Sequence, residues 1–213
     1  RTKVSPNGDA TTNLFLDLAT KTSVGDLAIT DITDCAYGSQ VGKIGLGATV
    51  ISPDEEYLYI TNIGNKSLIR VSTTDVNDFQ EYDIPDPGCK NGEYVPFALK
   101  YYNGKIYLGI TCTAYTAKTE SASKAIVYEW DPNVPSSFNS IFETSYIKGF
   151  WKDSPSTSIE TTHWFTDIDF TVEGNMIIGL SDRIGHRYCK VTNPRLDAPV
   201  SYTHLTLPTK PSV

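Results

Sequence analysis

Thr166-Asp-Ile-Asp-Phe-Thr-Val-Glu-Gly-Asn-Met-Ile-Ile-Gly-Leu-Ser-Asp-Arg-Ile-Gly-His186 has the pattern of two strands joined by a tight turn. Apolar side chains alternate with polar or small ones on both sides of Glu173-Gly174. Alternation with a period of two is typical of strands that bury one face, and glycine after an acidic residue is typical of a hairpin turn. The stretch therefore predicts an antiparallel hairpin followed directly by a cluster of polar side chains.

Two earlier segments show the same pattern. Residues 48–62 place a Pro-Asp turn between two strands, and residues 97–111 place an Asn-Gly turn there. Each of them is followed by another alternating strand, at residues 67–71 and 125–130. Repeated hairpin units, together with frequent glycine, proline and aromatic residues and few runs of helix formers, predict an all-β fold.

The spacing of the units indicates how the sheets are arranged. The interval from Leu58 to the equivalent Ile106 matches the roughly 40 to 50 residues of a four-stranded propeller blade. The interval from Ile106 to Met176 is longer because a stretch rich in proline, serine and aromatic residues lies between positions 132 and 164. We expect an incomplete β-propeller of about three to four blades of antiparallel strands, with a β-sandwich with long loops as the alternative.

The charge balance limits the partners of the chain. The chain carries 18 Lys and Arg against 25 Asp and Glu, a formal net charge of -7. Nucleic-acid binding needs clustered basic residues that displace counterions from phosphates, so nucleic acid is not an expected partner. The Gly-Lys-Ile-Gly-Leu-Gly run at 42–47 lacks the Lys-Ser/Thr ending and the following helix of a phosphate-binding loop, which argues against a nucleotide.

Residues 200–213 have a different origin from the rest of the chain in our interpretation. Read back into codons, Val-Ser-Tyr-Thr-His-Leu-Thr-Leu-Pro-Thr matches a transposon-end adapter used to prepare DNA libraries. We exclude this segment from the expected fold as a non-native, adapter-derived tail. Because the chain also begins with Arg1 rather than Met, we expect residues 1–199 to be a fragment of one β-propeller domain, cut from a longer reading frame.

The four cysteines, Cys35, Cys89, Cys112 and Cys189, are widely spaced and contain no C-x-x-C pair, so a zinc site is not expected. Cys89 and Cys112 flank a unit in which an Asn-Gly turn folds one strand back on the other, which brings the two ends within disulfide reach. We predict a disulfide between them and hence an oxidising compartment; two buried free thiols are the alternative. The pairing of Cys35 and Cys189 stays open.

Several of these segments together resemble one family. They are the run 42–47, the Ser52-Pro-Asp turn, the block between Cys89 and Cys112, and the motif Asp-Ile-Asp-Phe-x-x-x-Gly-x-Met-x-x-Gly-x-x-Asp-Arg-x-Gly-His at 167–186. Most of the chain before the tail resembles the propeller-like region of large bacterial surface proteins that carry SdrD B-like repeats. The resemblance implies a secreted or cell-surface bacterial module with an adhesive role. Val95 departs from the family pattern, in which an arginine commonly precedes Pro-Phe.

Asp182, Arg183 and His186 follow the second strand of the opening stretch and are the candidate catalytic residues. A carboxylate can orient an imidazole for proton transfer while an arginine holds an anionic group. The structural alternative, which we favour, is an Asp182–Arg183 pair at a corner of the fold, with His186 bonded to the backbone. No serine stands in a Gly-x-Ser-x-Gly elbow, so no nucleophile is evident.

Asp167, Asp169 and Asp182 are candidate calcium ligands, because carboxylate oxygens bind Ca²⁺ and alternate residues of a strand share a face. An ordinary solvated strand face is the alternative, and no cofactor is expected. His163 and His186, the histidines outside the tail, are too few for a zinc or copper centre.

Aromatic side chains offer a further kind of site, a platform on which sugars stack. The candidates are Tyr101, Tyr102, Tyr107, Tyr115, Trp130, Trp151 and Trp164. Most of them are expected to pack between sheets. Trp151 and Trp164 are the better ligand-binding candidates, because they lie in the irregular insertion, where surface loops carry recognition.

These observations favour a non-enzymatic extracellular or cell-surface binding module, a fragment of a larger bacterial surface protein. Its expected partners are a protein or a glycan at the cell surface and the other domains of the same full-length chain. No run of about 18 apolar residues is present, so no membrane span is expected in this sequence. The alternative is a propeller enzyme, a hydrolase or lyase, that uses Asp182, Arg183 and His186.

Overall fold

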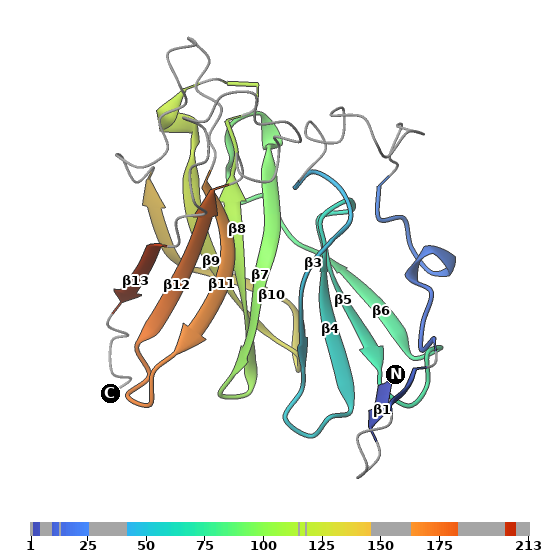
Figure 1. Cartoon of the computed structure of the whole chain (residues 1–213). Helices are drawn as coiled ribbons and strands as arrows, with labels where there is room; N and C mark the ends of the chain where they lie inside the picture. Colours follow the sequence, from blue (N-terminus) through green and yellow to red (C-terminus); the bar gives the residue numbers. More distant parts are fainter. Residues whose placement is uncertain are drawn as a thin grey trace, which may run out of the picture.

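Antiparallel strands make up the fold. The computed structural model describes residues 2–4, 10–12, 14–25, 42–114, 116–117, 119–145, 163–182 and 203–207. Within these ranges the helical segments are short 3-10 turns at Leu18–Thr20, Lys90–Gly92 and Glu120–Ala122, and none is long and apolar enough to cross a membrane. The prediction of an all-β fold is confirmed (Figure 1).

The large sheets follow one another along the chain (Figure 1). The first contains β3 (Leu46–Ile51), β4 (Tyr57–Asn62), β5 (Ser67–Ser72) and β6 (Phe79–Asp83). The second contains β7 (Tyr94–Tyr102), β8 (Lys105–Cys112), β9 (Lys124–Asp131) and β10 (Val134–Ser145). The third contains β11 (His163–Phe170), β12 (Met176–Asp182) and β13 (Thr203–Leu207), and a small separate sheet pairs β1 (Thr2–Val4) with β2 (Ala10–Thr12). In each large sheet the strands lie in chain order and neighbours are antiparallel.

The turn residues that the sequence marks do form hairpins. Asn103 and Gly104 have φ angles of 49° and 82°, the left-handed conformation that a two-residue hairpin turn requires. Gly174, with a φ angle of 83°, lies in the turn that leads β11 back onto β12. The hairpin predicted from the stretch 166–186 is therefore confirmed over these two strands.

Strands β7, β8 and β9 of the second sheet are covered on both faces. Its contact with the first sheet is formed by residues that include Tyr59, Leu68, Leu108, Ile110 and Trp130. Its contact with the third sheet is formed by residues that include Ala98, Val127, Phe165, Ile168 and Ile178. Because successive side chains of a strand point to opposite faces, β8 and β9 supply side chains to both contacts. The three sheets therefore stack in series, with the second in the middle.

Hydrogen bonds join the sheets close to their first strands. The Thr61 hydroxyl on β4 donates to the Phe97 carbonyl oxygen on β7 at 2.9 Å. On the other side of the second sheet, the Phe165 amide on β11 donates to the Thr111 hydroxyl on β8 at 3.0 Å. The first strands β3, β7 and β11 also bring neighbouring sheets into contact. These bonds satisfy polar groups between the layers and fix how the sheets lie on one another.

The arrangement differs in part from the predicted propeller. The described residues form sheets of four, four and three strands, and they show neither a closed ring nor a number of blades. They do not form the two-layer sandwich either, because three layers are stacked in series. The physical reason is that alternation reveals which residues share a face, but it does not reveal what covers that face.

A disulfide joins Cys89 to Cys112, as predicted. The two Cα atoms are 5.3 Å apart, within the usual range for a disulfide. Cys112 is the last residue of β8, Cys89 precedes the 3-10 turn before β7, and both are buried. Cys35 and Cys189 lie outside the described residues.

β13 lies in the segment 200–213 that the sequence marks as non-native. Its backbone pairs with β12, from Leu207 opposite Met176 to Thr203 opposite Leu180. The division into a domain at 1–199 and an adapter-derived tail stays a prediction. The tail nevertheless contributes a strand to the third sheet in Figure 1.

Candidate functional site

The predicted catalytic cluster lies at the end of β12. Asp182 is the last residue of this strand, and its backbone is paired with that of His163 on β11. Arg183 and His186 lie outside the described residues. The catalytic role of Asp182, Arg183 and His186 therefore stays a prediction.

Two of the three candidate calcium ligands, Asp167 and Asp169, are exposed on β11. The Asp169 carboxylate forms an ion pair with the Lys100 ammonium of β7 at 2.7 Å and accepts the Phe170 amide at 2.9 Å. The Lys100 hydrogen bond, and after it this backbone bond, lower the pKa of Asp169. Within the described ranges no three His, Cys, Asp or Glu side chains gather as a metal site. Asp169 thus already has a cationic partner from the protein itself.

Two aromatic candidates are part of the interior. Trp130 is fully buried between the first and second sheets, with its ring centroid 6.0 Å from that of Tyr59 and 5.0 Å from that of Tyr82. Tyr101 packs against the same cluster. These rings stabilise the contact between the two sheets.

Of the two tryptophans favoured as ligand-binding residues, Trp164 lies within the described residues and Trp151 does not. Trp164 is half-buried on β11, and its ring centroid lies 4.5 Å from that of Phe97 on β7. Trp151 and Tyr115 lie outside the described residues. Packing between the second and third sheets explains the position of Trp164, and the ligand-binding role of both tryptophans stays a prediction.

Three aromatic rings do gather at a partly exposed rim between the second and third sheets. Tyr102 and Phe170 are stacked, with ring centroids 4.0 Å apart and an interplanar angle of 8°. Tyr107 meets Phe170 edge to face at 4.8 Å. All three are half-buried, and the neighbouring turn residue Asn103 is exposed. We call Tyr102, Tyr107 and Phe170 the rim cluster.

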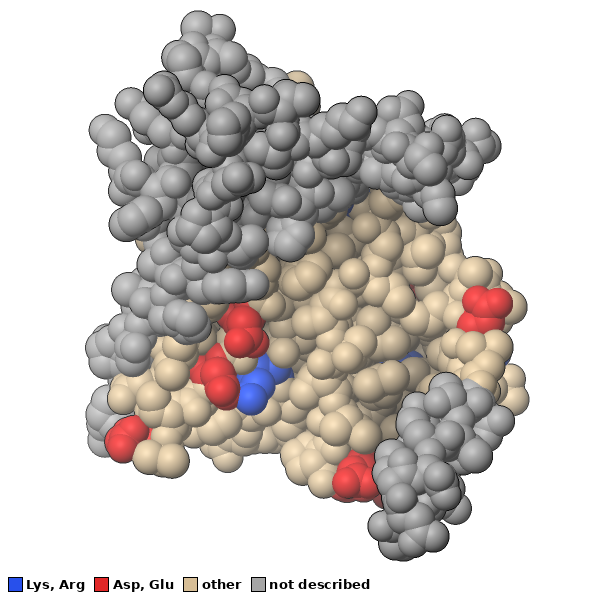
Figure 2. All heavy atoms as spheres, viewed as in Figure 1, with Lys and Arg blue, Asp and Glu red and all other residues tan. Residues whose placement is uncertain are grey.

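Ion pairs accompany the rim cluster. Lys100 pairs with Asp169, the neighbour of Phe170, and the Lys105 ammonium bonds to the Glu129 carboxylate. The Tyr107 hydroxyl donates to the same carboxylate at 3.0 Å. Burial, and after it this hydrogen bond, raise the pKa of Tyr107. On the face drawn in Figure 2 most of the described surface is uncharged, and basic and acidic side chains adjoin in one small area.

The rim cluster combines aromatic surface with charged and hydrogen-bonding groups. This combination can bind a ligand that offers an apolar face edged by hydroxyl groups, as sugar rings do. Sequence reasoning named Tyr102 and Tyr107 but missed Phe170. The signal that could have found Phe170 is its place at the end of a strand, next to the turn of the hairpin.

Glu81 on β6 is the centre of a polar network that sequence reasoning also missed. Its Oε1 accepts hydrogen bonds from the side chains of Asn62 at 3.1 Å, of Asn65 at 3.3 Å and of Ser67. Asn65 also donates to the Thr22 hydroxyl at 2.9 Å. Burial raises the pKa of Glu81, but the bonds from Ser67, Thr22, Asn65 and Asn62 outweigh it, so the pKa is lowered. The network holds the segment around Thr22 against the first sheet.

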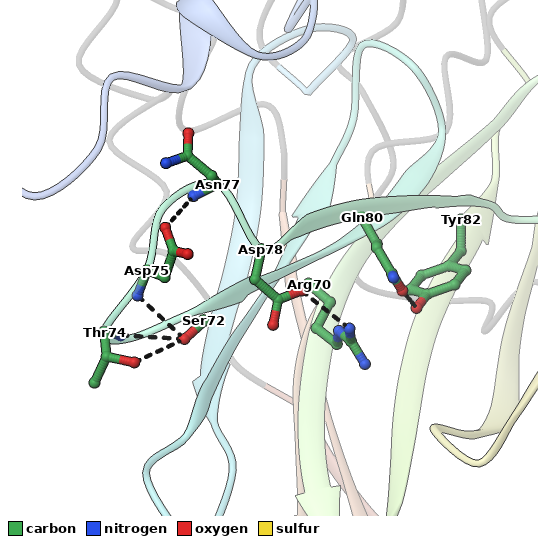
Figure 3. Close-up of polar contacts among 8 residues, drawn as sticks. All are labelled: Arg70, Ser72, Thr74, Asp75, Asn77, Asp78, Gln80 and Tyr82. Atoms are coloured by element: carbon green, nitrogen blue, oxygen red, sulfur yellow. Dashed lines mark hydrogen bonds and ion pairs between the residues drawn. The ribbon is translucent and has the colours of Figure 1, made fainter.

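The turn between β5 and β6 contains another group of polar contacts (Figure 3). The Ser72 hydroxyl accepts the backbone amides of Thr74 and Asp75 at 3.2 and 3.3 Å. Arg70 on β5 forms an ion pair with Asp78 at 3.3 Å, as Figure 3 shows. These contacts stabilise the turn, which gives them a structural role.

Curated proteins similar to this chain come from Dictyostelium discoideum. Colossin-D is 30% identical over 195 residues, and the match covers 84% of this chain and 20% of Colossin-D. Colossin-A is 25% identical over 177 residues, and the match covers 73% of this chain and 2% of Colossin-A. The chain thus spans a fifth or less of the length of these relatives. No family model matches the chain, and no solved structure matches it significantly.

These relatives correct the bacterial assignment. They are eukaryotic proteins, whereas the sequence motifs pointed to bacterial surface proteins with SdrD B-like repeats. The resemblance to that bacterial family is wrong, and the expectations of a bacterial origin and of bacterial adhesion fall with it. Its motifs are strand and turn signatures, which unrelated all-β proteins share because the same backbone geometry requires them.

Proposed function

We propose that this chain is a non-enzymatic extracellular module with a structural and binding role in a longer protein. The observation that carries the proposal is the buried disulfide between Cys89 and Cys112. Disulfides persist in oxidising compartments, above all outside the cell. The similarity to parts of the much longer Colossin-D and Colossin-A supports a module within a longer chain.

The engagement of charged side chains also favours a structural role. Glu81 accepts several hydrogen bonds from neighbouring side chains, Arg70 pairs with Asp78, and Asp169 pairs with Lys100. Groups with such partners hold a framework together. They contrast with a catalytic base, which must present its lone pair to a substrate.

At the level of the fold, we propose that the three large sheets are successive blades of a propeller. Support comes from β3, β7 and β11, the first strands, through which neighbouring sheets contact one another. In a propeller the strands of each blade follow in order around a shared axis. The chain-order pairing within each sheet agrees with this arrangement.

Production in two compartments tests the extracellular role. The chain is made with a signal peptide in a secretory host and, in parallel, in a reducing cytosol, and both products are digested without reductant. We expect a linked Cys89–Cys112 peptide and a cooperatively melting product from the secretory route alone. Equal melting temperatures for the two products, with both thiols free in the cytosolic one, would contradict the proposal.

For the binding role we propose that the rim cluster takes a glycan. Its half-buried rings can stack on a sugar face, and Lys100, Asp169 and Glu129 can bond to hydroxyl groups. Trp151 and Trp164 are the further candidates that the sequence offers for the same role.

Saturation-transfer NMR with a panel of mono- and oligosaccharides tests this binding. Tyr102→Ala is expected to abolish the transfer that the unchanged chain gives, because it removes one ring of the stacked pair. Val172→Ala is the matched control, since Val172 is 97% exposed and its truncation costs no packing. The glycan proposal would be wrong if no sugar of the panel received saturation transfer, or if the transfer persisted in Tyr102→Ala.

A further inference from the structure

The third sheet differs from the first two in the origin of its third strand. In the first sheet β5 begins at Ser67, shortly after β4 ends at Asn62, and in the second sheet β9 begins at Lys124 after β8 ends at Cys112. In the third sheet β12 ends at Asp182, but its partner β13 begins only at Thr203. The place beside β12 is therefore filled by a segment that is distant along the chain.

The register of β13 on β12 pairs both leucines of β13 with apolar residues of β12, and it pairs Thr203 with Leu180. Met176 and Ile178 of β12 are buried in the contact with the second sheet. Leu207 is the register partner of Met176, and Leu205 is that of Ile178. If β13 slipped by one residue along β12, both leucines would lie opposite β12 residues whose side chains point to the other face of the sheet. The pairing thus selects an extended segment with apolar residues at alternate positions.

The edge of β12 that faces β13 offers backbone amide and carbonyl groups to any strand that lies along it. β11 occupies the opposite edge of β12 in the same sheet, as Figure 1 shows. Added strands bind an edge mainly through backbone hydrogen bonds, and alternate side chains give selectivity. None of these interactions requires that the added strand be joined covalently to β12.

We propose that this edge of β12 is a strand-acceptor site for an extended peptide with apolar residues at alternate positions. Thr203–Leu207 occupies the site in this chain. A free peptide of the same pattern takes its place when the tail is prevented from pairing. The site is independent of the rim cluster and of the proposed glycan binding.

Amide hydrogen exchange on the 213-residue chain tests the site. Leu205→Pro removes a backbone donor from the middle of β13 and prevents strand pairing. We expect β12 amides to exchange on the order of tenfold faster or more in this variant. A peptide of residues 201–209 added in excess should restore their protection. A control peptide of the same composition, in which Leu205 exchanges places with His204 and Leu207 with Thr206, should not, because its leucines then lie in the other phase of the strand.

Slow amide exchange in β8 and β9 shows that the variant is folded. If these strands lose their protection in Leu205→Pro, the double variant Leu205→Thr, Leu207→Thr is used in its place. Unchanged exchange of β12 in the variants would overturn the proposal. So would a loss of protection that the matched peptide does not reverse, or that the control peptide reverses equally well.

Discussion

Cys89 and Cys112 close the loop that contains the β7–β8 hairpin, and both residues are buried. Replacing both with alanine frees this loop in the unfolded chain. We expect the free energy of unfolding to fall by about 3 kcal/mol. Denaturant unfolding of the two proteins measures the difference, with the reduced wild type as a second reference. An unchanged midpoint in both comparisons would show that the disulfide does not stabilise the fold.

Glu81→Gln tests the polar network on β6. The pKa of Glu81 is lowered in the folded state, so its charged form stabilises the fold above the ordinary glutamate pKa of about 4.3. This stabilisation is lost as the pH falls through the lower, folded-state pKa. We therefore expect the variant to melt earlier than the wild type at pH 7 and the two to converge in acid. Melting curves across this range provide the measurement.

Glu55→Gln is the matched control, because Glu55 is exposed in the turn before β4. Its melting curves should follow those of the wild type at every pH. Parallel curves for Glu81→Gln and the wild type would contradict the proposed network.

The sequence predicted the disulfide but missed the Glu81 network and the role of Phe170. The disulfide could be predicted because a hairpin brings its own two ends together. The Glu81 network could not, since it joins β6 to Asn62 and Asn65 at the β4–β5 turn and to the distant segment around Thr22, and these parts of the chain share no pattern. Phe170 was missed because its partner Tyr102 lies on another sheet.

Between elements, Gly109 lets β8 lie close to β11. A Cβ at this position would lie 2.3 Å from the Phe165 ring and 2.8 Å from the Ala98 Cβ. We expect Gly109→Ala to lower the free energy of unfolding by about 1 to 3 kcal/mol, because the second and third sheets must move apart. Denaturant unfolding measures the loss.

Phe165→Leu in the same chain makes room for the added methyl group. The double variant should therefore lose less stability than the sum of the two single variants, which a double-mutant cycle measures. Strictly additive losses would show that Gly109 and Phe165 do not pack against each other.

Hairpins are the elements that the sequence predicted best. Alternating apolar residues and turn glycines identified β7–β8 and β11–β12 with their turns. What covers each sheet could not be predicted, because alternation describes a strand and not its neighbour in space. The same limit explains why Trp164, expected in a surface loop, is half-buried against Phe97.

At the scale of the whole molecule, the central feature is the series of three stacked sheets. The strand patterns were sufficient to predict an all-β fold. They were not sufficient to place the family, since short strand and turn motifs recur in unrelated proteins. The longer relatives Colossin-D and Colossin-A are eukaryotic proteins, so the expectation of a bacterial origin is not supported.

Nuclear Overhauser spectroscopy of the intact chain tests the stacking most directly. If the three sheets stack in series, the Trp130 indole contacts Tyr59 and Tyr82 on one face of the second sheet, and Gly109 contacts Phe165 on the other. Loss of either set of contacts while the other persists would contradict the stacking, because the second sheet would then be covered on a single face.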